Sequence, residues 1–354
     1  MSNLIAEASI WLQDPICNTG SIQERTHGVL SKFKGYIKHN KVEIERVIGL
    51  SVKDLISEVT KCQNVFGVII SSYLNGVQYI SITRAKSFLD GLNANILPIG
   101  ERLYKARESH SNYLFAKDEL FHIPYDKRDR IGNQRFSISG MPCLYLASSS
   151  YICWEELGRP EFGSCNFCGF SNKKTIPVYD FTLPEKLNTV EDIRRVCAIL
   201  ACSLSAKRDA LFKEEYILPQ CLLQALILKF HCNKPNRKQF AVKYLSVHVL
   251  NGDADCFEID LNNPVWVNRL SNYIFPAASG KKKGYNQLLR NLFIQTDVTT
   301  MFKETLLYPD KLIKGASHDV YLDSQFGLMD AFLDKKMGYD PLRQETDFVK
   351  MTTI

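Results

Sequence analysis

The residues most able to do chemistry lie between positions 134 and 160, in the sequence QRFSISGMPCLYLASSSYICWEELGRP. Arg135 precedes a turn that contains glycine, a short apolar stretch with Tyr145, and a predicted helix with two adjacent carboxylates, Glu155 and Glu156. A guanidinium can bind a phosphate through two parallel hydrogen bonds, and a carboxylate can stabilise positive charge that develops during a reaction. A strand, a turn and a helix in this order can line a pocket, so this segment is the first candidate for an active site.

Each of these residues, taken alone, has an ordinary structural interpretation. Arg135 would be a surface cation, Tyr145 a core aromatic residue, and Glu155 or Glu156 a helix residue. Their order along the chain is what favours a functional site.

That order resembles the RES domain, a family of NAD⁺-degrading toxins. The family pattern runs arginine, aromatic residue, glycine, an apolar pair, tyrosine, a small residue and, one helix later, glutamate. The matching residues here are Arg135, Phe136, Gly140, Leu144, Tyr145, Ala147 and Glu156. Further segments resemble the family in the same order, namely LYKAR (103–107), FHIPYDKRDRI (121–131), EEYILPQCLLQAL (214–226), KYLS (243–246) and NYIFP (272–276).

The resemblance implies an enzyme that cleaves the nicotinamide–ribose bond of NAD⁺, acting as a toxin or defence effector with a paired antitoxin or an activator protein. NAD⁺ is then a substrate, and no cofactor is expected. Cleavage leaves positive charge on the ribose, which Glu156 would stabilise in the transition state. Arg135, supported by Arg107, would bind the pyrophosphate. Ser246 would bind the ribose or orient the nucleophile, and Tyr145 would stack on a ring or donate its hydroxyl.

Two departures from the family pattern leave choices open. Lys105 stands where the family usually has an arginine, so either Lys105 or Arg107 faces the phosphates. Adjacent helix residues point about 100° apart, so only one of Glu155 and Glu156 can face the pocket. The spacing from Arg135 favours Glu156.

Three functions remain open at this point. The enzyme is a glycohydrolase or a phosphorylase, depending on whether water or inorganic phosphate accepts the ADP-ribosyl group. The same residues would serve an ADP-ribosyltransferase that modifies a macromolecule. A non-catalytic protein that binds a nucleotide is the third interpretation.

Other motifs give little support to a different chemistry. Cys165 and Cys168 have the spacing of zinc ligands, but neither a second C-x-x-C nor a nearby histidine pair completes a site, so no metal is expected. The chain also lacks a G-x-S-x-G elbow, a Walker loop and a dinucleotide G-x-G-x-x-G motif.

The hydrophobic patterning predicts an α+β fold, with an ADP-ribosyltransferase-like mixed sheet and flanking helices implied by the resemblance. Apolar residues recur at helical spacing from about 21 to 96, with Ser51 as a helix N-cap. Strands are predicted at 143–148, 175–181 and 239–250, and helices at 149–158, 189–206 and 211–231. We therefore expect a helical region at 1–96, regulatory or partner-binding, a catalytic domain at 97–325 and a tail at 326–354 with one short amphipathic helix.

The composition indicates a folded cytoplasmic protein. The net charge of +6 is spread over 354 residues, too diffuse to indicate a nucleic-acid-binding protein, and Lys281 to Lys283 are expected in a solvated loop. No apolar stretch approaches the roughly 18 residues of a membrane span, and the N-terminus lacks the pattern of a secretory signal. The eleven cysteines, many among apolar neighbours, are expected to be mostly reduced and buried. A homo-oligomeric state stays open.

Overall fold

The computed structural model describes residues 4–109, 113–184, 186–207, 210–232, 238–246, 269–300, 321 and 324–338. Its N-terminal helices are α1 (Leu4–Gln13), α2 (Pro15–Asn18), α3 (Ile22–His39), α4 (Lys41–Ile48), α5 (Val52–Leu74) and α6 (Gln78–Leu89). The later helices are α7 (Ser150–Glu156), α8 (Val190–Cys202), α9 (Ile217–Ile227), α12 (Gln287–Leu292) and α14 (Gln325–Lys336). The strands are β1 (Asn95–Leu97), β2 (Arg102–Glu108), β3 (Cys143–Ala147), β4 (Cys165–Asn172), β5 (Ile176–Phe181), β6 (Ala241–Leu245), β7 (Ser271–Pro276), β8 (Phe293–Gln295) and β9 (Thr299–Thr300).

The helices of the N-terminal region begin at residues that cap them. Ser21 and Glu24 form a capping box at the start of α3, in which the Ser21 amide donates to the Glu24 carboxylate over 2.8 Å. Ser51 caps α5, and its hydroxyl accepts a hydrogen bond from the amide of Asp54. The predicted helical region and the predicted N-cap at Ser51 are therefore confirmed.

The described strands form one mixed sheet in the order β1-β5-β6-β7-β3-β2-β4-β8, with β9 paired to β4. Strands β5 and β6 run parallel, and the other strand pairs of the described residues are antiparallel. β3, β5 and β6 lie where strands were predicted, and α7, α8 and α9 lie within the predicted helices. The end of the third predicted strand, 247–250, lies outside the described residues. Helices flank the sheet, so the α+β prediction is confirmed.

Alternate residues of the central strands face two different cores. On β3, Leu144 and Leu146 belong to one hydrophobic cluster, whereas Ala147 belongs to the other. On β2, Leu103 and Tyr104 divide in the same way. This period of two is what a strand with both faces covered requires, and it explains why β3, with the sequence CLYLA, is apolar along its length.

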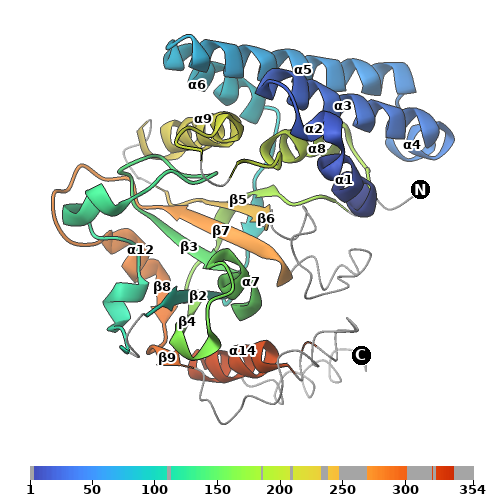
Figure 1. The fold of residues 1–354 in the computed structure, drawn as a ribbon. Helices are drawn as coiled ribbons and strands as arrows, with labels where there is room; N and C mark the ends of the chain where they lie inside the picture. Colours follow the sequence, from blue (N-terminus) through green and yellow to red (C-terminus); the bar gives the residue numbers. More distant parts are fainter. Residues whose placement is uncertain are drawn as a thin grey trace.

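The N-terminal helices form a layer on top of α8 and α9, and α8 in turn contacts the sheet (Figure 1). α5 contacts α8 and α9, and α6 packs against α9. An ion pair between Glu58 of α5 and Arg194 of α8 joins the two layers. One hydrophobic core runs through both. The chain changes from helix to strand at β1, close to the boundary predicted near residue 97, and the division into functional domains stays a prediction.

The C-terminal helix α14 lies against α7 and β4. Gly169 of β4 allows this close approach, because a Cβ atom at that position would come within 2.9 Å of the Met337 side chain just after the helix. The predicted helix in the tail is thus present, and its buried face is part of the same core as α7.

The cysteines that the structure describes are buried and free of disulfides, as expected. Cys165 and Cys168 lie on β4, and the described residues contain no group of three or more histidine, cysteine or acidic side chains that could hold a metal. Lys281, Lys282 and Lys283 are exposed in a loop, as predicted. Within the described part of the chain, every helix is too short or too polar to cross a membrane.

Candidate functional site

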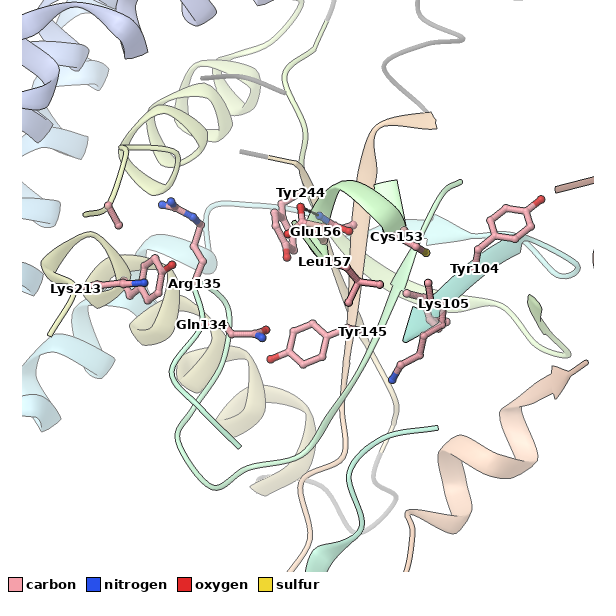
Figure 2. Close-up of a pocket in the computed structure, with 16 residues that line it drawn as sticks. Tyr104, Lys105, Gln134, Arg135, Tyr145, Cys153, Glu156, Leu157, Lys213 and Tyr244 are labelled. Atoms are coloured by element: carbon pink, nitrogen blue, oxygen red, sulfur yellow. Dashed lines mark hydrogen bonds between the residues drawn. The ribbon is translucent and has the colours of Figure 1, made fainter. Parts of the chain in front are cut away.

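The main pocket has a volume of about 540 Å³ and opens over the central strands of the sheet. This volume lies within the range of roughly 300–1,000 Å³ that small-molecule sites occupy. Its walls come from β2, β3, β6, β7, the end of α7, the loop before β3 and the connection between α8 and α9 (Figure 2). The lining residues are Tyr104, Lys105, Ala106, Gln134, Arg135, Tyr145, Leu146, Ala147, Cys153, Glu156, Leu157, Ala206, Lys213, Tyr216, Tyr244 and Asn272.

The register of the sheet explains why these strands share one pocket. Tyr104, Ala147, Asn272 and Tyr244 pair in a row across β2, β3, β7 and β6, so their side chains lie on the same face. Strands β2 and β3, both fully described, meet at the single pair of Tyr104 and Ala147. Residues on either side of that pair line the pocket, which therefore lies where the two strands separate.

Glu156 is the last residue of α7 and places its carboxylate in the pocket. The Ser246 hydroxyl and the Asn272 amide each donate a hydrogen bond of 2.7 Å to Glu156 Oε1. Both donors approach the same oxygen, and no hydrogen bond from the described residues reaches Oε2, which can therefore meet a substrate. Ser246 is fully buried behind the carboxylate, which makes it a support for Glu156 in this structure.

Glu155 points away from the pocket, so the choice between the two adjacent carboxylates is settled geometrically. Its side chain is buried and pairs with Arg159 Nε over 2.9 Å. The chain reverses directly after α7 through Gly158 at φ +83° and Arg159 at φ +61°, which brings Arg159 back to Glu155. As predicted from spacing, Glu156 faces the pocket and Glu155 does not.

Arg135 lines the opposite end of the pocket and is held by main-chain oxygens. Its Nη1 donates to the carbonyls of Leu204, over 3.0 Å, and Cys202. The guanidinium also lies over the Tyr216 ring, 5.2 Å from the ring centroid. Burial lowers the pKa of Arg135, but a guanidinium stays charged at any physiological pH. Among the described residues only Nη1 of this guanidinium has hydrogen-bond partners, so Nε and Nη2 are the atoms that can bind a phosphate.

Gln220 of α9 fixes the loop that carries Arg135. Its side-chain amide donates to the carbonyl of Gln134, over 2.9 Å, and to the side chain of Asn133. We did not assign a role to Gln220 from the sequence. The similarity of residues 214–226 to the family's Tyr-x-x-Pro-Gln segment is the signal that points to it.

Of the two cations on β2, the structure brings Lys105 to the pocket. Its ammonium donates to the carbonyl of Phe121 over 2.7 Å, and burial lowers its pKa to about 8. Arg107 is exposed and lies over the Phe115 ring, 4.2 Å from its centroid, outside the set of residues that line the pocket. The structure therefore places Lys105, and not Arg107, in the pocket together with Arg135. The expected support of Arg135 by Arg107 does not fit this arrangement.

Tyr145 projects into the middle of the pocket from β3. Its hydroxyl is 3.5 Å from the carbonyl of Phe136, and burial holds the pKa of this hydroxyl well above its usual value. Tyrosine 145 is therefore neutral, able to donate a hydrogen bond and to present its ring to a ligand.

Several further lining residues had no role predicted from the sequence, among them Tyr216, Tyr244, Asn272 and Lys213. Tyr216, Tyr244 and Asn272 lie within the segments that resemble the RES family, so the resemblance could have identified them. Lys213 lies outside every matched segment, and its ammonium is 5.5 Å from the Tyr216 ring centroid. Only the fold reveals it.

The charges of the pocket are separated along its length. Figure 2 shows Arg135 and Lys213 on one side of Tyr145, and Lys105 on the other, with Glu156 between. Such a pocket suits an extended ligand that carries anionic groups and that presents a developing positive charge near the carboxylate.

This chain is similar to a bacterial protein named as a toxin. It is 29% identical over 272 residues to "Putative toxin YopC" of Bacillus subtilis (strain 168). The match covers 68% of this chain and 58% of that protein, so the chain spans less than two thirds of its relative. No family model matches the chain. No solved structure matches it either.

The N-terminal helices reach the wall of this pocket through Arg25 of α3. The guanidinium of Arg25 pairs with Glu215 and donates to the carbonyl of Ser205 over 2.5 Å. Both side chains of the ion pair are buried. Because Glu215 directly precedes Tyr216, the stacking partner of Arg135, α3 helps to hold one end of the pocket in place.

Proposed function

We propose that this protein is an enzyme that cleaves the nicotinamide–ribose bond of NAD⁺ and acts as a toxin. The observation that carries the proposal is the Glu156 carboxylate, held by Ser246 and Asn272 in a pocket whose ends carry Arg135 and Lys105. An ADP-ribosyltransferase-like origin of the sheet belongs to the same proposal, as does a partner antitoxin or activator.

The reaction needs a carboxylate at the sugar. Breaking the bond between the pyridinium nitrogen and ribose C1 leaves the electron pair on neutral nicotinamide and positive charge on the ribose. Glu156 stabilises that charge more in the transition state than in the ground state. With water as acceptor the products are nicotinamide, ADP-ribose and a proton. With hydrogen phosphate as acceptor they are nicotinamide, ADP-ribose phosphate and a proton.

The donors on Glu156 Oε1 prepare the carboxylate for this task. Hydrogen bonds from Ser246 and Asn272 fix its direction before substrate arrives, so Oε2 needs no reorganisation to meet the ribose. The cationic groups at the two ends of the pocket would bind the pyrophosphate and any phosphate acceptor.

The similarity to a protein named as a putative toxin supports the biological part of the proposal. Loss of NAD⁺ stops growth, which is the effect expected of a toxin. Expression of the wild-type chain should therefore deplete cellular NAD⁺ and halt growth, whereas a variant without the carboxylate should not.

The proposal is tested with the purified full chain and its Glu156→Gln variant. Each is incubated with NAD⁺, with and without phosphate, and nicotinamide and ADP-ribose products are separated by chromatography. Glutamine keeps the shape of the side chain and removes its charge. We expect the rate to fall at least about a hundredfold, equivalent to ~2.7 kcal/mol of transition-state stabilisation.

The adjacent Glu155→Gln variant is the matched control, because Glu155 lies outside the pocket and pairs with Arg159. It should keep the rate within about threefold. If ADP-ribose phosphate forms when phosphate is present, phosphate is the acceptor, and if only ADP-ribose forms, water is. Transfer of radiolabel from the ADP-ribosyl part of NAD⁺ to a macromolecule would instead favour an ADP-ribosyltransferase. Intact NAD⁺ after long incubation at high protein concentration would overturn the enzymatic proposal.

A further inference from the structure

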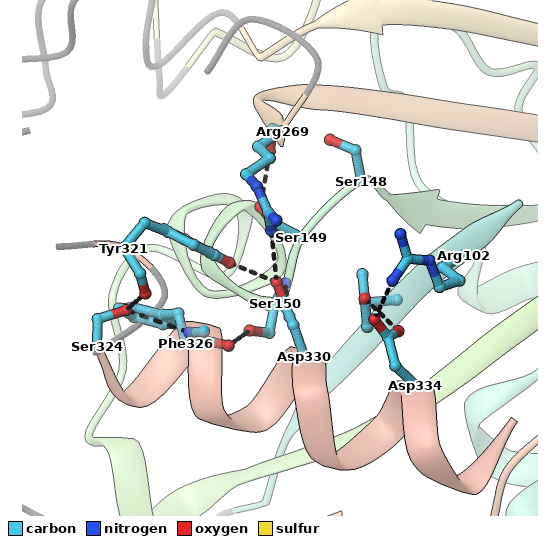
Figure 3. A network of polar contacts seen from close by, with 12 residues as sticks. Arg102, Ser148, Ser149, Ser150, Arg269, Tyr321, Ser324, Phe326, Asp330 and Asp334 are labelled. Carbon is cyan, nitrogen blue, oxygen red and sulfur yellow. Dashed lines mark hydrogen bonds and ion pairs between the residues drawn. The ribbon is translucent and has the colours of Figure 1, made fainter. Parts of the chain in front are cut away.

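A buried carboxylate outside the pocket connects the C-terminal helix to both elements that hold Glu156. Asp330 of α14 is 4% exposed. Figure 3 shows it between Ser150 at the start of α7, Tyr321, and Arg269 in the chain that leads into β7. The proposed chemistry gives this carboxylate no direct part, and it does not line the pocket.

The first connection is to α7, the helix that ends at Glu156. Asp330 Oδ1 accepts a hydrogen bond of 2.9 Å from the amide of Ser150, the first residue of that helix. The Ser150 hydroxyl donates to the carbonyl of Phe326 in α14 over 3.1 Å. The first turn of α7 is thus bound to α14 twice.

The second connection is to β7, which carries Asn272, a hydrogen-bond donor to Glu156. Asp330 Oδ2 accepts from the Tyr321 hydroxyl over 2.6 Å and lies 3.4 Å from Arg269 Nη1. The carbonyl of Arg269 accepts in turn from the Ser149 hydroxyl over 2.7 Å. The residues that lead into β7 are therefore bound to the turn before α7 and to α14.

We propose that Asp330 is a positioning residue for Glu156, and that α14 belongs to the catalytic unit. This inference rests on the proposed function. Asp330 contacts the start of the helix that carries the carboxylate and the segment before the strand that carries its amide donor. One side chain thereby sets the relative position of Glu156 and Asn272.

The short length of α7 makes such support necessary. A helix of seven residues has few internal hydrogen bonds, and isolated helices below about 12 residues are marginal in water. Its direction therefore depends on its contacts with β2, β3 and α14, and those at its first turn include Asp330. A change in that direction moves Glu156 at its other end, and a misplacement of about 1 Å can cost on the order of a hundredfold in rate.

The test compares Asp330→Ala and Asp330→Asn with the wild-type full chain, measuring kcat and KM for NAD⁺ cleavage. Alanine removes the contacts of the Asp330 carboxylate in both connections and leaves the bonds to the carbonyls of Phe326 and Arg269, whereas the asparagine oxygen can still accept from the Ser150 amide. We expect kcat to fall about tenfold or more in the alanine variant and to recover in large part with asparagine. KM for NAD⁺ should stay within about threefold, because Arg135, Lys105 and Tyr145 are untouched.

Met329→Ala is the matched control on the same helix. Met329 is buried beside Asp330, so its truncation weakens the packing of α14 but leaves the carboxylate. When the two variants lose a similar amount of thermal stability, the kcat of Asp330→Ala should be at least about fivefold lower than the kcat of Met329→Ala. Equal losses of kcat in the two variants, or no recovery with asparagine, would show that Asp330 has only a structural role.

A readout that does not depend on activity separates this inference from the proposed function. Amide hydrogen exchange of Ser150, Ile152 and Cys153 should be faster in Asp330→Ala than in Met329→Ala. Should the wild type leave NAD⁺ intact, the proposed function fails and hydrogen exchange still decides whether Asp330 holds α7. If the alanine variant does not fold, Arg269→Met, which removes the contact of Arg269 with Oδ2, replaces it, and an unchanged kcat there would overturn the inference.

Discussion

At the scale of single residues, the pocket combines a supported carboxylate with cations of different character. Glu156 receives two hydrogen bonds on one oxygen, and Arg135 is bound to main-chain carbonyls. Lys105 differs from both, because burial makes its charge depend on pH in an accessible range. An arginine in the place of Lys105, usual in the RES family, would be charged at every such pH.

This difference leads to a prediction for substrate binding. Burial lowers the pKa of Lys105 from 10.5 to about 8, so the folded protein loses this charge above pH 8. KM for NAD⁺ should therefore rise as pH increases from 7 to 9, because an anionic substrate loses a cationic partner. Between about pH 8 and 10.5 the unfolded chain binds more protons than the folded one, so this group makes folding more favourable as pH rises.

The measurement is a pH profile of kcat/KM for the wild type and Lys105→Met. The variant should have a KM raised about tenfold at pH 7, consistent with the ~1.5 kcal/mol of a hydrogen bond to a charged group, and a flatter profile between pH 7 and 9. Lys281→Met, in the exposed loop, serves as the control and should keep the wild-type profile. An unchanged KM in Lys105→Met would show that Lys105 does not bind substrate.

At the scale of elements, the connection between α8 and α9 is the part of the pocket that depends most on its neighbours. It presents the carbonyl of Leu204 to Arg135 and the ring of Tyr216 beneath it. Arg25 of α3 binds this connection at Ser205 and Glu215. The N-terminal region therefore influences the pocket through direct contact.

Replacing Arg25 with alanine should damage both stability and substrate binding. Glu215 would be left buried without its partner, and breaking a buried ion pair in this way costs ~3–5 kcal/mol. The remaining folded protein should have a KM for NAD⁺ raised several-fold, because Tyr216 and the carbonyls that hold Arg135 are less well fixed. Urea denaturation and steady-state kinetics measure the two effects.

Arg46→Ala provides the comparison, since Arg46 is an exposed arginine on the neighbouring helix α4. Its unfolding free energy should stay within ~0.5 kcal/mol of the wild type, with KM unchanged. A wild-type KM in a folded Arg25→Ala variant would contradict the coupling between α3 and the pocket.

At the scale of the whole molecule, the N-terminal helices cover α8 and α9, whose outer faces would be exposed if only the sheet packed against them. Residues 196–202 of α8 are all buried, and so are residues 217–223 of α9. A helix that is buried all around needs neighbours on both sides. The sheet side supplies one of them, and α3, α5 and α6 supply the other.

We accordingly predict that residues 94–354 do not fold as a separate catalytic domain. Removal of the first 93 residues would expose the apolar outer faces of α8 and α9, and contiguous apolar surfaces of that kind promote aggregation. The shortened chain should be insoluble or elute as large aggregates in size-exclusion chromatography. A monomeric fragment with a cooperative thermal transition near that of the full chain would refute the prediction and favour an independent N-terminal module.

The sequence by itself determined the local structure and the chemical character of the site. Cap residues such as Ser51 and the period of apolar residues depend on neighbours along the chain, so the helices between residues 21 and 96, the helices α7, α8 and α9, and the strands β3, β5 and β6 could be predicted. The ordered match of Arg135, Tyr145 and Glu156 to a known family pattern identified three pocket residues, and spacing along α7 favoured Glu156 over Glu155.

Only the tertiary structure decided which side chains meet. Lys213 and Asn272 reach the pocket from distant parts of the chain, and the opening between β2 and β3 places Lys105 there in preference to Arg107. The hydrogen bonds that Ser246 donates to Glu156 and that Ser150 donates to Asp330 span 90 and 180 residues. Sequence patterns report contacts between near neighbours, whereas such distant pairs are fixed by the sheet register and by the packing of α7 and α14.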